Sequence, residues 1–370
     1  MPQIERVTIH QRAITLRRPF VTAVRTATSI DALVVEVLDS EGRSGWGEAP
    51  TSWRVTGESV ASVTAAIEGP LQNAILGRDN DDPWASSIAL ESAAARNSSA
   101  RMALDCALFD LAAQARGITL HDFLGGTRVK VRSDMTLSAA LRESDLDDLV
   151  RVALEHVAEG FRTLQVKVGA GGDDVAALSA VRDAVGAQIT LRVDANQGWT
   201  AQEAVRVIGA CEDAGVDLEM VEQPVHRDDI DGLAFVTQHV HTTVMADEAV
   251  WTRREFREII RSHAADMINI KLAKTGGLSG ALELLADARR NQVDVIIGCM
   301  AETHVGIGAA AALASVVDTD GTKPSRAHDL DGGLWLTRSP VEGGVSYEGD
   351  GVVLASAPGI GITGLAARGV

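Results

Sequence analysis

The chain has 370 residues, of which 46% are hydrophobic and 23% charged, ordinary globular values that exclude disordered and low-complexity proteins. Its 51 acidic residues outnumber 34 basic ones, and the net charge of −17 disfavours a nucleic-acid partner or an anionic membrane surface. The three cysteines are too widely spaced for a disulfide framework or a zinc site, and no signal peptide or membrane-spanning run is visible. We therefore expect a soluble, cytoplasmic protein.

Residues 1–127 predict an α+β domain. Alternating or β-branched runs indicate strands at Ile4 to Leu16, Ala32 to Leu38 and Ser44 to Glu48. Apolar residues at helical spacing then indicate helices over 58–76 and 84–116. The chain from about residue 338 to 370 is rich in glycine with short β signals, and we expect it to return to this first domain.

Residues 128–337 repeat a short apolar run followed by an amphipathic segment. The apolar runs are Val129–Met135, Thr163–Val168, Ile189–Val193, Leu218–Val221, Thr243–Met245, Met267–Ile270 and Val293–Ile297, with a weaker strand near Ala327–Leu330. The helical segments between them are Asp145–Ala158, Asp173–Val185, Ala201–Ala214, Asp229–Gln238, Arg253–Ser262 and Leu278–Asn291. This α/β alternation predicts parallel strands in a closed TIM-like barrel. A doubly wound sheet is the alternative, but it predicts a GxGxxG motif after the first strand, and none is present.

Five of these predicted strands end in a charged residue. The residues are Lys167, Asp194, Glu222, Asp247 and Lys271, at intervals of 27, 28, 25 and 24 residues, each about one strand-helix unit. Because the carboxyl ends of barrel strands meet at one pocket mouth, we expect three carboxylates and two lysines to converge there.

Three converging carboxylates repel one another unless a cation neutralises them, and an all-oxygen ligand set favours Mg²⁺ over zinc. A single aspartate before a helix is more simply an N-cap, but three acids in phase at strand ends weaken that interpretation. The two lysines are either salt-bridged side chains or proton-transfer groups. In the second case, burial and a nearby cation would lower the pKa of each lysine. Lys274, one turn beyond Lys271, is interpreted as a loop or structural lysine.

The motifs Gln165-Val-Lys167, Asp194-Ala-Asn-Gln-Gly-Trp199, Glu222-Gln-Pro224, Ala246-Asp247-Glu248 and Asn269-Ile-Lys271-Leu-Ala-Lys-Thr-Gly-Gly277 resemble those of the enolase superfamily, in its muconate-lactonizing subgroup. The resemblance runs along nearly the whole chain. It implies a (β/α)7β barrel with an N-terminal capping domain, Mg²⁺ held by Asp194, Glu222 and Asp247, and Lys167 and Lys271 as the catalytic acid-base pair.

Three further segments resemble the dipeptide epimerases, notably those acting on L-Ala-D/L-Glu. They are the loop from Arg18 to Thr26 containing Arg25, the segment Gly298-Cys-Met-Ala-Glu302, and Asp329-Leu-Asp331. The resemblance implies a 1,1-proton transfer at the α-carbon of the second residue of a dipeptide. It also implies substrate contacts from Arg25, Thr136, Gln165, Cys299, Ala301, Asp329 and Asp331, with the two aspartates holding the dipeptide's ammonium group and Glu302 near its carboxylate.

Two of these assignments have a simpler structural interpretation. Asp329 and Asp331 could form a turn before Gly332-Gly333, and Arg25 could be a solvated arginine on a loop. The chain also departs from the family pattern at Gln165, where a first lysine normally precedes Lys167 by two residues.

The alternatives within the subgroup are muconate cycloisomerase and N-acylamino-acid racemase, neither of which needs an ammonium clamp. A sugar-acid dehydratase of the mandelate racemase type would need a histidine base where this chain has Lys271. A non-catalytic ligand-binding relative is the alternative outside the enzymes, and the resemblance further implies a homo-oligomer.

Overall fold

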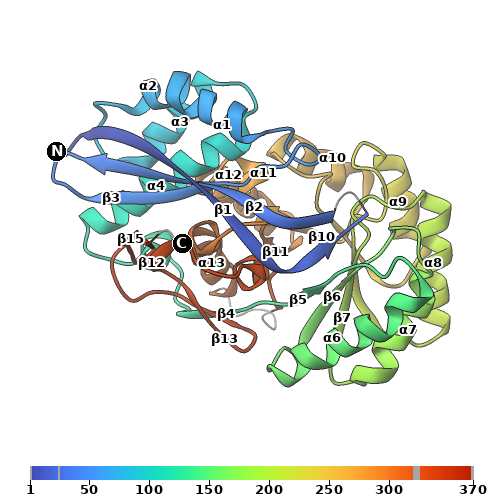
Figure 1. Cartoon of the computed structure of the whole chain (residues 1–370). Coiled ribbons are helices and arrows are strands. Elements are labelled where there is room, and N and C mark those ends of the chain that lie inside the picture. The colour runs from blue at the N-terminus through green and yellow to red at the C-terminus, as the bar shows by residue number, and fades with distance from the viewer. Residues whose placement is uncertain (1, 24–25, 320–325, 368–370) are drawn as a thin grey trace.

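A computed structural model of the chain describes residues 2–23, 26–319 and 326–367. Figure 1 shows an N-terminal sheet and helices in blue beside a curled parallel sheet surrounded by helices, with the C-terminal strands in red below the N-terminal sheet. The α/β class and the barrel architecture predicted from the sequence are confirmed.

The N-terminal part is an antiparallel sheet covered by helices. The strands β1 (Ile4–Val21), β2 (Thr26–Asp39) and β3 (Ser44–Ala49) pair in that order. The helices are α1 (Val60–Ala66), a π-helical turn (Ile67–Leu71), α2 (Gln72–Ile75), α3 (Pro83–Ala93), α4 (Ser98–Ala115) and α5 (Leu120–Leu124). A β-carbon at Gly47 would lie 1.9 Å from the carbonyl oxygen of Ala103, so glycine on β3 permits α4 to pack against the sheet.

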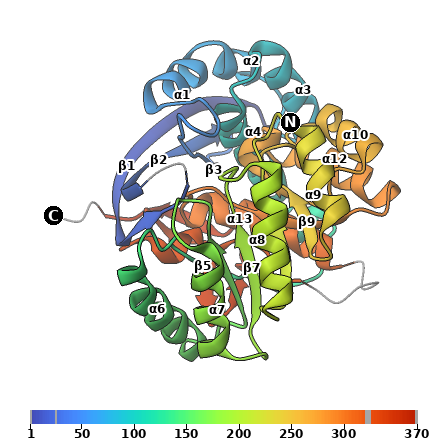
Figure 2. The same ribbon diagram turned by 90° about the vertical axis from the view of Figure 1, so that its right-hand side faces the viewer.

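The parallel sheet has the strand order β11-β10-β9-β8-β7-β6-β5. Its strands are β5 (Met135–Leu137), β6 (Thr163–Lys167), β7 (Thr190–Asp194), β8 (Leu218–Glu222), β9 (Thr243–Ala246), β10 (Met267–Lys271) and β11 (Asp294–Gly298). The helices are α6 (Leu146–Ala158), α7 (Asp174–Val185), α8 (Ala201–Asp213), α9 (Ile230–His239), α10 (Arg253–Ser262), α11 (Leu272–Thr275), α12 (Leu278–Arg290) and α13 (His304–Asp318). Figure 2 shows α6, α7 and α8 along the outside of these strands.

The two edges of this sheet meet at a short eighth segment. His328 bridges Ser133 next to β5, and Asp329 bridges Gly298 at the end of β11, both in parallel register. The amide of Asp329 donates to Ile297, and the carbonyl of His328 accepts from Asp134. Backbone hydrogen bonds therefore close the barrel where the sequence predicts its weakest strand.

The first predicted barrel strand, Val129–Met135, is wrong in its bounds. Residues Lys130–Arg132 form β4, which pairs antiparallel with β14 (Gly351–Val353), and the barrel strand begins only at Met135. Between them the amide of Ser133 donates to Asp350 and that of Asp134 to His328. The segment predicted as one strand is therefore two strands that belong to different sheets.

The C-terminal strands pack on both parts of the molecule. β13 (Ser346–Glu348) and β14 extend β4, while β12 (Val341–Gly343) pairs with β15 (Ile362–Leu365). Gly359 hydrogen-bonds with Ile118 and Leu120 of the N-terminal part. The domain limits of 1–127 and 128–337 stay a prediction. None of the helices among the described residues is long and apolar enough to cross a membrane.

Candidate active site

Five predicted side chains lie in one row at the carboxyl ends of the barrel strands. Lys167 ends β6, Asp194 ends β7, Glu222 ends β8, Asp247 follows β9 and Lys271 ends β10. Parallel register places Lys167 beside Asp194 and Asp194 beside Glu222. All five side chains are buried, with at most 7% of their surface exposed. The three carboxylates are therefore adjacent, with one lysine on each side.

Each lysine forms an ion pair with the nearest carboxylate. Lys167 Nζ lies 2.6 Å from Asp194 Oδ2, and Lys271 Nζ lies 2.9 Å from Asp247 Oδ2 and 3.7 Å from Glu222 Oε1. Burial alone would lower the pKa of both lysines, but the carboxylates around them raise it above the ordinary value. The lowered lysine pKa predicted from the sequence is not found in this arrangement, because the acids pair with the lysines themselves.

The carboxylates differ from one another in their electrostatic surroundings. Burial and then the Asp194 charge raise the pKa of Glu222 well above its usual value. Burial also acts to raise the pKa of Asp247, but the ammonium groups of Lys271 and Lys274 hold it below the ordinary value. Neighbouring positive charge is thus what keeps a buried carboxylate ionised here.

Other side chains, to which the sequence analysis gave no role or only a structural one, hold these carboxylates in place. The backbone and side-chain amides of Asn196 donate to Asp194 at 2.7 and 2.9 Å. Gln223 Oε1 accepts from the amides of Asp247 and Ala249, and Lys274 Nζ donates to Asp247 Oδ1 at 2.5 Å. Lys274 is completely enclosed, which agrees with its predicted structural role. Asn196 and Gln223 lie next to the predicted ligands Asp194 and Glu222 in the sequence, and this position is the signal that could have identified them.

The eighth segment brings a second group of acids to the barrel mouth. Cys299, Asp329 and Asp331 are buried and offer ligand atoms that all lie within 4.8 Å of one another. Asp331 Oδ2 accepts from the backbone amide of Thr136 at 2.6 Å and from Trp335 Nε1 at 3.0 Å. Burial and then the Asp329 charge raise the pKa of Asp331 to about 7. Paired, hydrogen-bonded aspartates in this position suit a cationic ligand group.

One distance connects the two groups of acids. Lys271 Nζ lies 3.7 Å from Asp329 Oδ2, so this lysine stands between the carboxylate row and the aspartate pair. The alternative interpretation, in which Asp329 and Asp331 only form a turn, explains their place before Gly332 but does not explain why both side chains are buried.

The segment after β11 joins the barrel to the N-terminal sheet. Ala301 packs with Leu16, Ile30 and Leu336, so the β1–β2 hairpin covers this side of the site. Glu302 accepts from the amide of Met300, and burial and then Glu48 raise its pKa to about 8. Glu48 of β3 in turn accepts from the amides of Thr303 and Gly306 at the start of α13. Glu302 is thus buried close to the site but has no contact that tests a substrate role.

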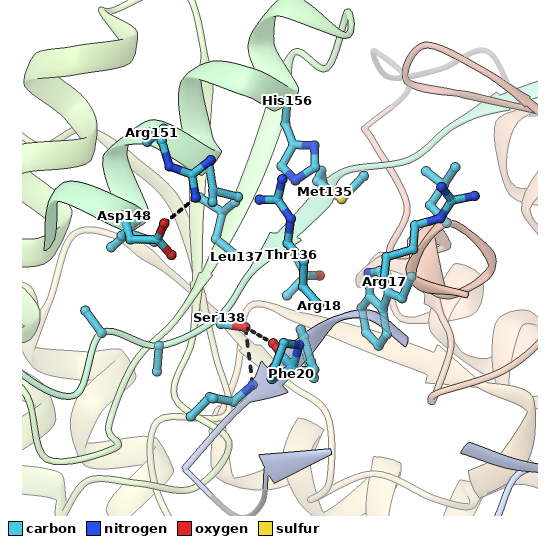
Figure 3. A pocket seen from close by; sticks show the side chains of 18 of the residues that line it. Arg17, Arg18, Phe20, Met135, Thr136, Leu137, Ser138, Asp148, Arg151 and His156 are labelled. Carbon is cyan, nitrogen blue, oxygen red and sulfur yellow. Dashed lines mark hydrogen bonds and ion pairs between the residues drawn. The ribbon is translucent and has the colours of Figure 1, made fainter. Parts of the chain in front are cut away.

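A cavity of about 1130 Å³ lies next to this site, between β1, β5, α6 and Trp335. Figure 3 shows Arg17, Arg18, Phe20, Thr136 and Ser138 around it, and Phe20 stacks on Trp335. The lysines and the carboxylate row do not line this cavity, because they fill the barrel mouth by pairing with one another. Thr136 borders the cavity and also bonds Asp331, which links the two regions.

Two predicted substrate residues remain. Gln165 is fully buried, and its amide nitrogen lies 3.2 Å from Glu222 Oε2. Arg25 lies outside the residues that the structure describes, so its role stays a prediction.

Family models cover both parts of the chain. Residues 4–125 match the mandelate racemase / muconate lactonizing enzyme N-terminal domain, and residues 148–366 match the enolase C-terminal domain-like family. The chain belongs to the enolase C-terminal domain-like family, with a mandelate racemase / muconate lactonizing enzyme N-terminal domain. The resemblance found in the sequence is therefore confirmed over both segments.

Individual members of the family match nearly the whole chain. The L-Ala-D/L-Glu epimerase of Bacillus subtilis (strain 168) is 38% identical over 98% of both chains, and its substrate-liganded structure has a TM-score of 0.93, covering 99% of this chain and 100% of that one. The hydrophobic dipeptide epimerase of Enterococcus faecalis is 37% identical over 98% of this chain and 99% of its own. A structure of the Enterococcus faecalis V583 dipeptide epimerase with Mg and L-Leu-L-Tyr has a TM-score of 0.90 at 37% identity, over 97% of this chain and 99% of that one.

The carboxylate row fits a hard divalent cation. Its three ligands offer only oxygen, are buried, and come from neighbouring strand ends. Among the described residues their ligand atoms do not all lie within 4.8 Å of one another, since the outer two pair with lysines. Oxygen-only ligands are what Mg²⁺ prefers. Asp194, Glu222 and Asp247 are therefore the residues that would hold it.

Proposed function

We propose that this chain is a Mg²⁺-dependent dipeptide epimerase, an isomerase that transfers a proton at the α-carbon of the second residue of a dipeptide. The observation that carries the proposal is the placement of two buried lysines on opposite sides of three buried carboxylates. Inversion of a carbon centre needs an acid and a base on its two faces, and this row supplies both.

The α-proton of a carboxylate is very weakly acidic, because its removal places further negative charge on an anion. Mg²⁺, when bound, supplies the positive charge that neutralises the substrate carboxylate and stabilises this added charge. Asp194, Glu222 and Asp247 would hold the cation, while Asn196 and Lys274 donate to two of these carboxylates and Gln223 accepts from the backbone amide of Asp247.

Lys167 and Lys271 transfer the protons. One Nζ, in its neutral form, removes the α-proton, and the other, in its ammonium form, delivers a proton to the opposite face. The family resemblance assigns Lys167 to the face of the D epimer and Lys271 to that of the L epimer. The carboxylates raise the pKa of both lysines, and a bound cation that took up their negative charge would weaken this effect, so that one lysine could be neutral.

Asp329 and Asp331 hold the ammonium group of the first residue. Lys271 Nζ lies 3.7 Å from Asp329, which suits a substrate whose reacting carbon and ammonium group are separated by one peptide unit. Thr136, Cys299 and Ala301 complete the wall around the first residue. Muconate has no ammonium group, and the α-nitrogen of an N-acylamino acid is acylated and uncharged, so this aspartate pair favours dipeptides over the other substrates of the subgroup.

The proposed substrate is L-Ala-D/L-Glu or a related dipeptide, with Arg25 meeting a side-chain carboxylate at the second residue. The similarity to L-Ala-D/L-Glu epimerases supports an acidic side chain, while the similarity to a hydrophobic dipeptide epimerase and the neutral Gln165 support an uncharged one. Assembly into a homo-oligomer and a cytoplasmic location remain predictions of the sequence.

The direct test is a library of dipeptides incubated with the enzyme in D₂O. We expect Mg²⁺-dependent deuterium uptake at the second α-carbon together with interconversion of the two epimers. EDTA treatment should stop both, and added Mg²⁺ should restore both. Deuterium uptake that continues without a divalent cation, or none with any dipeptide, would refute the proposal.

A further inference from the structure

Two buried amide side chains hold Glu222 from opposite sides of the barrel. Gln165 lies two residues before Lys167 on β6, and Asn269 lies two residues before Lys271 on β10. Because strand side chains alternate, each amide points to the same face as its lysine, one layer deeper in the barrel. Gln165 Nε2 lies 3.2 Å from Glu222 Oε2, and Asn269 Nδ2 lies 2.8 Å from Glu222 Oε1.

The contact with Glu222 determines which end of each side-chain amide faces the carboxylate. A carboxylate can only accept, so each amide must turn its nitrogen toward Glu222. Both residues are 0% exposed, and the amide oxygens Gln165 Oε1 and Asn269 Oδ1 are left without hydrogen-bond partners. An unpaired buried acceptor is unfavourable, so the bond to Glu222 is the interaction that fixes these side chains. Each Glu222 oxygen keeps a second lone pair for a cation.

The carboxylates of the row already pair with ammonium groups. Lys167 pairs with Asp194, Lys271 with Asp247 and Glu222, and Lys274 with Asp247. Three ammonium groups thus face three carboxylates. A fourth ammonium group at residue 165 would lie in contact with Glu222 and would both pair with it and repel an incoming cation. A neutral amide orients the same carboxylate without either effect.

We propose that Gln165 is a positioning residue that keeps Glu222 available to the divalent cation, and that its neutral amide makes Mg²⁺ binding tighter than a lysine at this position would allow. This inference rests on the proposed function, since it takes Glu222 as a cation ligand. It also gives the departure from the family motif a physical consequence that can be measured without turnover.

The test is isothermal titration of metal-free enzyme with Mg²⁺ alone, comparing wild type with Gln165→Lys and Gln165→Met. We expect the Mg²⁺ Kd to rise at least about tenfold for the lysine variant and about threefold for methionine, which has similar size but donates no hydrogen bond. Ala139→Lys is the matched control. Ala139 is half-buried in the loop after β5, and the same charge there should change Kd by less than about twofold.

Two further variants separate the possible outcomes. Glu222→Gln should weaken Mg²⁺ binding strongly, and in that background Gln165→Met should no longer add its penalty, because the carboxylate that the amide orients is gone; a merely structural role would not predict this. Wild-type affinity in Glu222→Gln would refute the ligand assignment and with it the proposed metal site. Loss of affinity in Glu222→Gln with unchanged affinity in Gln165→Lys would refute only the inference about Gln165. If the lysine variant does not fold, an unchanged Kd in Gln165→Met overturns the inference.

Discussion

Gly298 is the parallel register partner of Lys271, and a β-carbon at residue 298 would lie 2.8 Å from Lys271 Cε and 2.5 Å from Asn269 Oδ1. The absence of a side chain on β11 therefore makes the space through which the lysine and the amide reach the carboxylate row. Glycine is needed at position 298 because it leaves space for Lys271 and Asn269, not because the backbone turns there.

Gly298→Ala should accordingly displace Lys271. We expect kcat to fall by about a hundredfold while the circular dichroism spectrum stays that of the wild type, because a shift of about 1 Å in a proton-transfer group is enough for such a loss. Gly209→Ala on α8 is the control. Apart from its chain neighbours and the backbone of its own helix, no atom lies within 4 Å of the added carbon there, and activity should be unchanged. Full activity in Gly298→Ala would show that the lysine does not need this space.

Protonation of Asp331 should cause the fall of kcat/KM at acid pH. Its pKa is raised to about 7 by burial and by Asp329, so below that pH the carboxyl is largely protonated and cannot pair with the substrate ammonium group. At saturating Mg²⁺, kcat/KM for a dipeptide should rise about tenfold per unit up to pH 7 and then level. The fall should be absent from kcat, because the bound ammonium group keeps the acid ionised. A profile of kcat/KM that is flat from pH 5.5 to 8 would exclude this role.

Lys274 should matter to stability more than its place beside the site suggests. Its Nζ donates to Asp247 Oδ1 and to the carbonyl oxygens of Asp247 and Asn269. Lys274→Met removes one of the two ammonium groups that pair with the buried Asp247 carboxylate, and the free energy of unfolding should fall by about 3 kcal/mol in urea titration. Lys130→Met, which removes an exposed pair with Glu348, should change it by less than about 0.5 kcal/mol. Equal stability of the two variants would contradict the structural role.

Arg25 carries the prediction on substrate choice. A guanidinium group matches a carboxylate in shape and charge, so Arg25→Met should lower kcat/KM for Ala-Glu by at least about tenfold, or roughly 1.4 kcal/mol of transition-state binding. Turnover of Ala-Leu should change much less. An equal loss for both dipeptides, or a wild-type preference for Ala-Lys over Ala-Glu, would show that Arg25 does not recognise an anion.

The residues that the sequence located best are those whose charge interrupts an apolar strand. Lys167, Asp194, Glu222 and Lys271 each end a run of buried residues, so strand alternation and spacing were enough to place them together. The first barrel strand was given the wrong bounds because Val129 to Arg132 alternates as a strand does, whereas the change of partner at Ser133 depends on His328 and Asp350, about 200 residues away.

The side chains that support the site were harder to find. Asn269 donates to Glu222, and Gln223 accepts from the amides of Asp247 and Ala249, but a neutral amide side chain gives no charge signal in the sequence. The contact of Glu48 with Thr303 spans 255 residues and joins two parts of the chain, so no local pattern indicates it. Only the closed barrel reveals these contacts.

The assignment of Lys167 and Lys271 to opposite faces of one carbon is the central claim. It is tested most directly by following deuterium uptake from D₂O into each separate epimer of a dipeptide substrate with Lys167→Ala and Lys271→Ala. Both variants should lose epimerisation, since inversion needs both faces. Lys271→Ala should retain exchange only with the D epimer and Lys167→Ala only with the L epimer. Epimerisation at a wild-type rate in either variant, or exchange of both epimers by one variant, would contradict the two-base account.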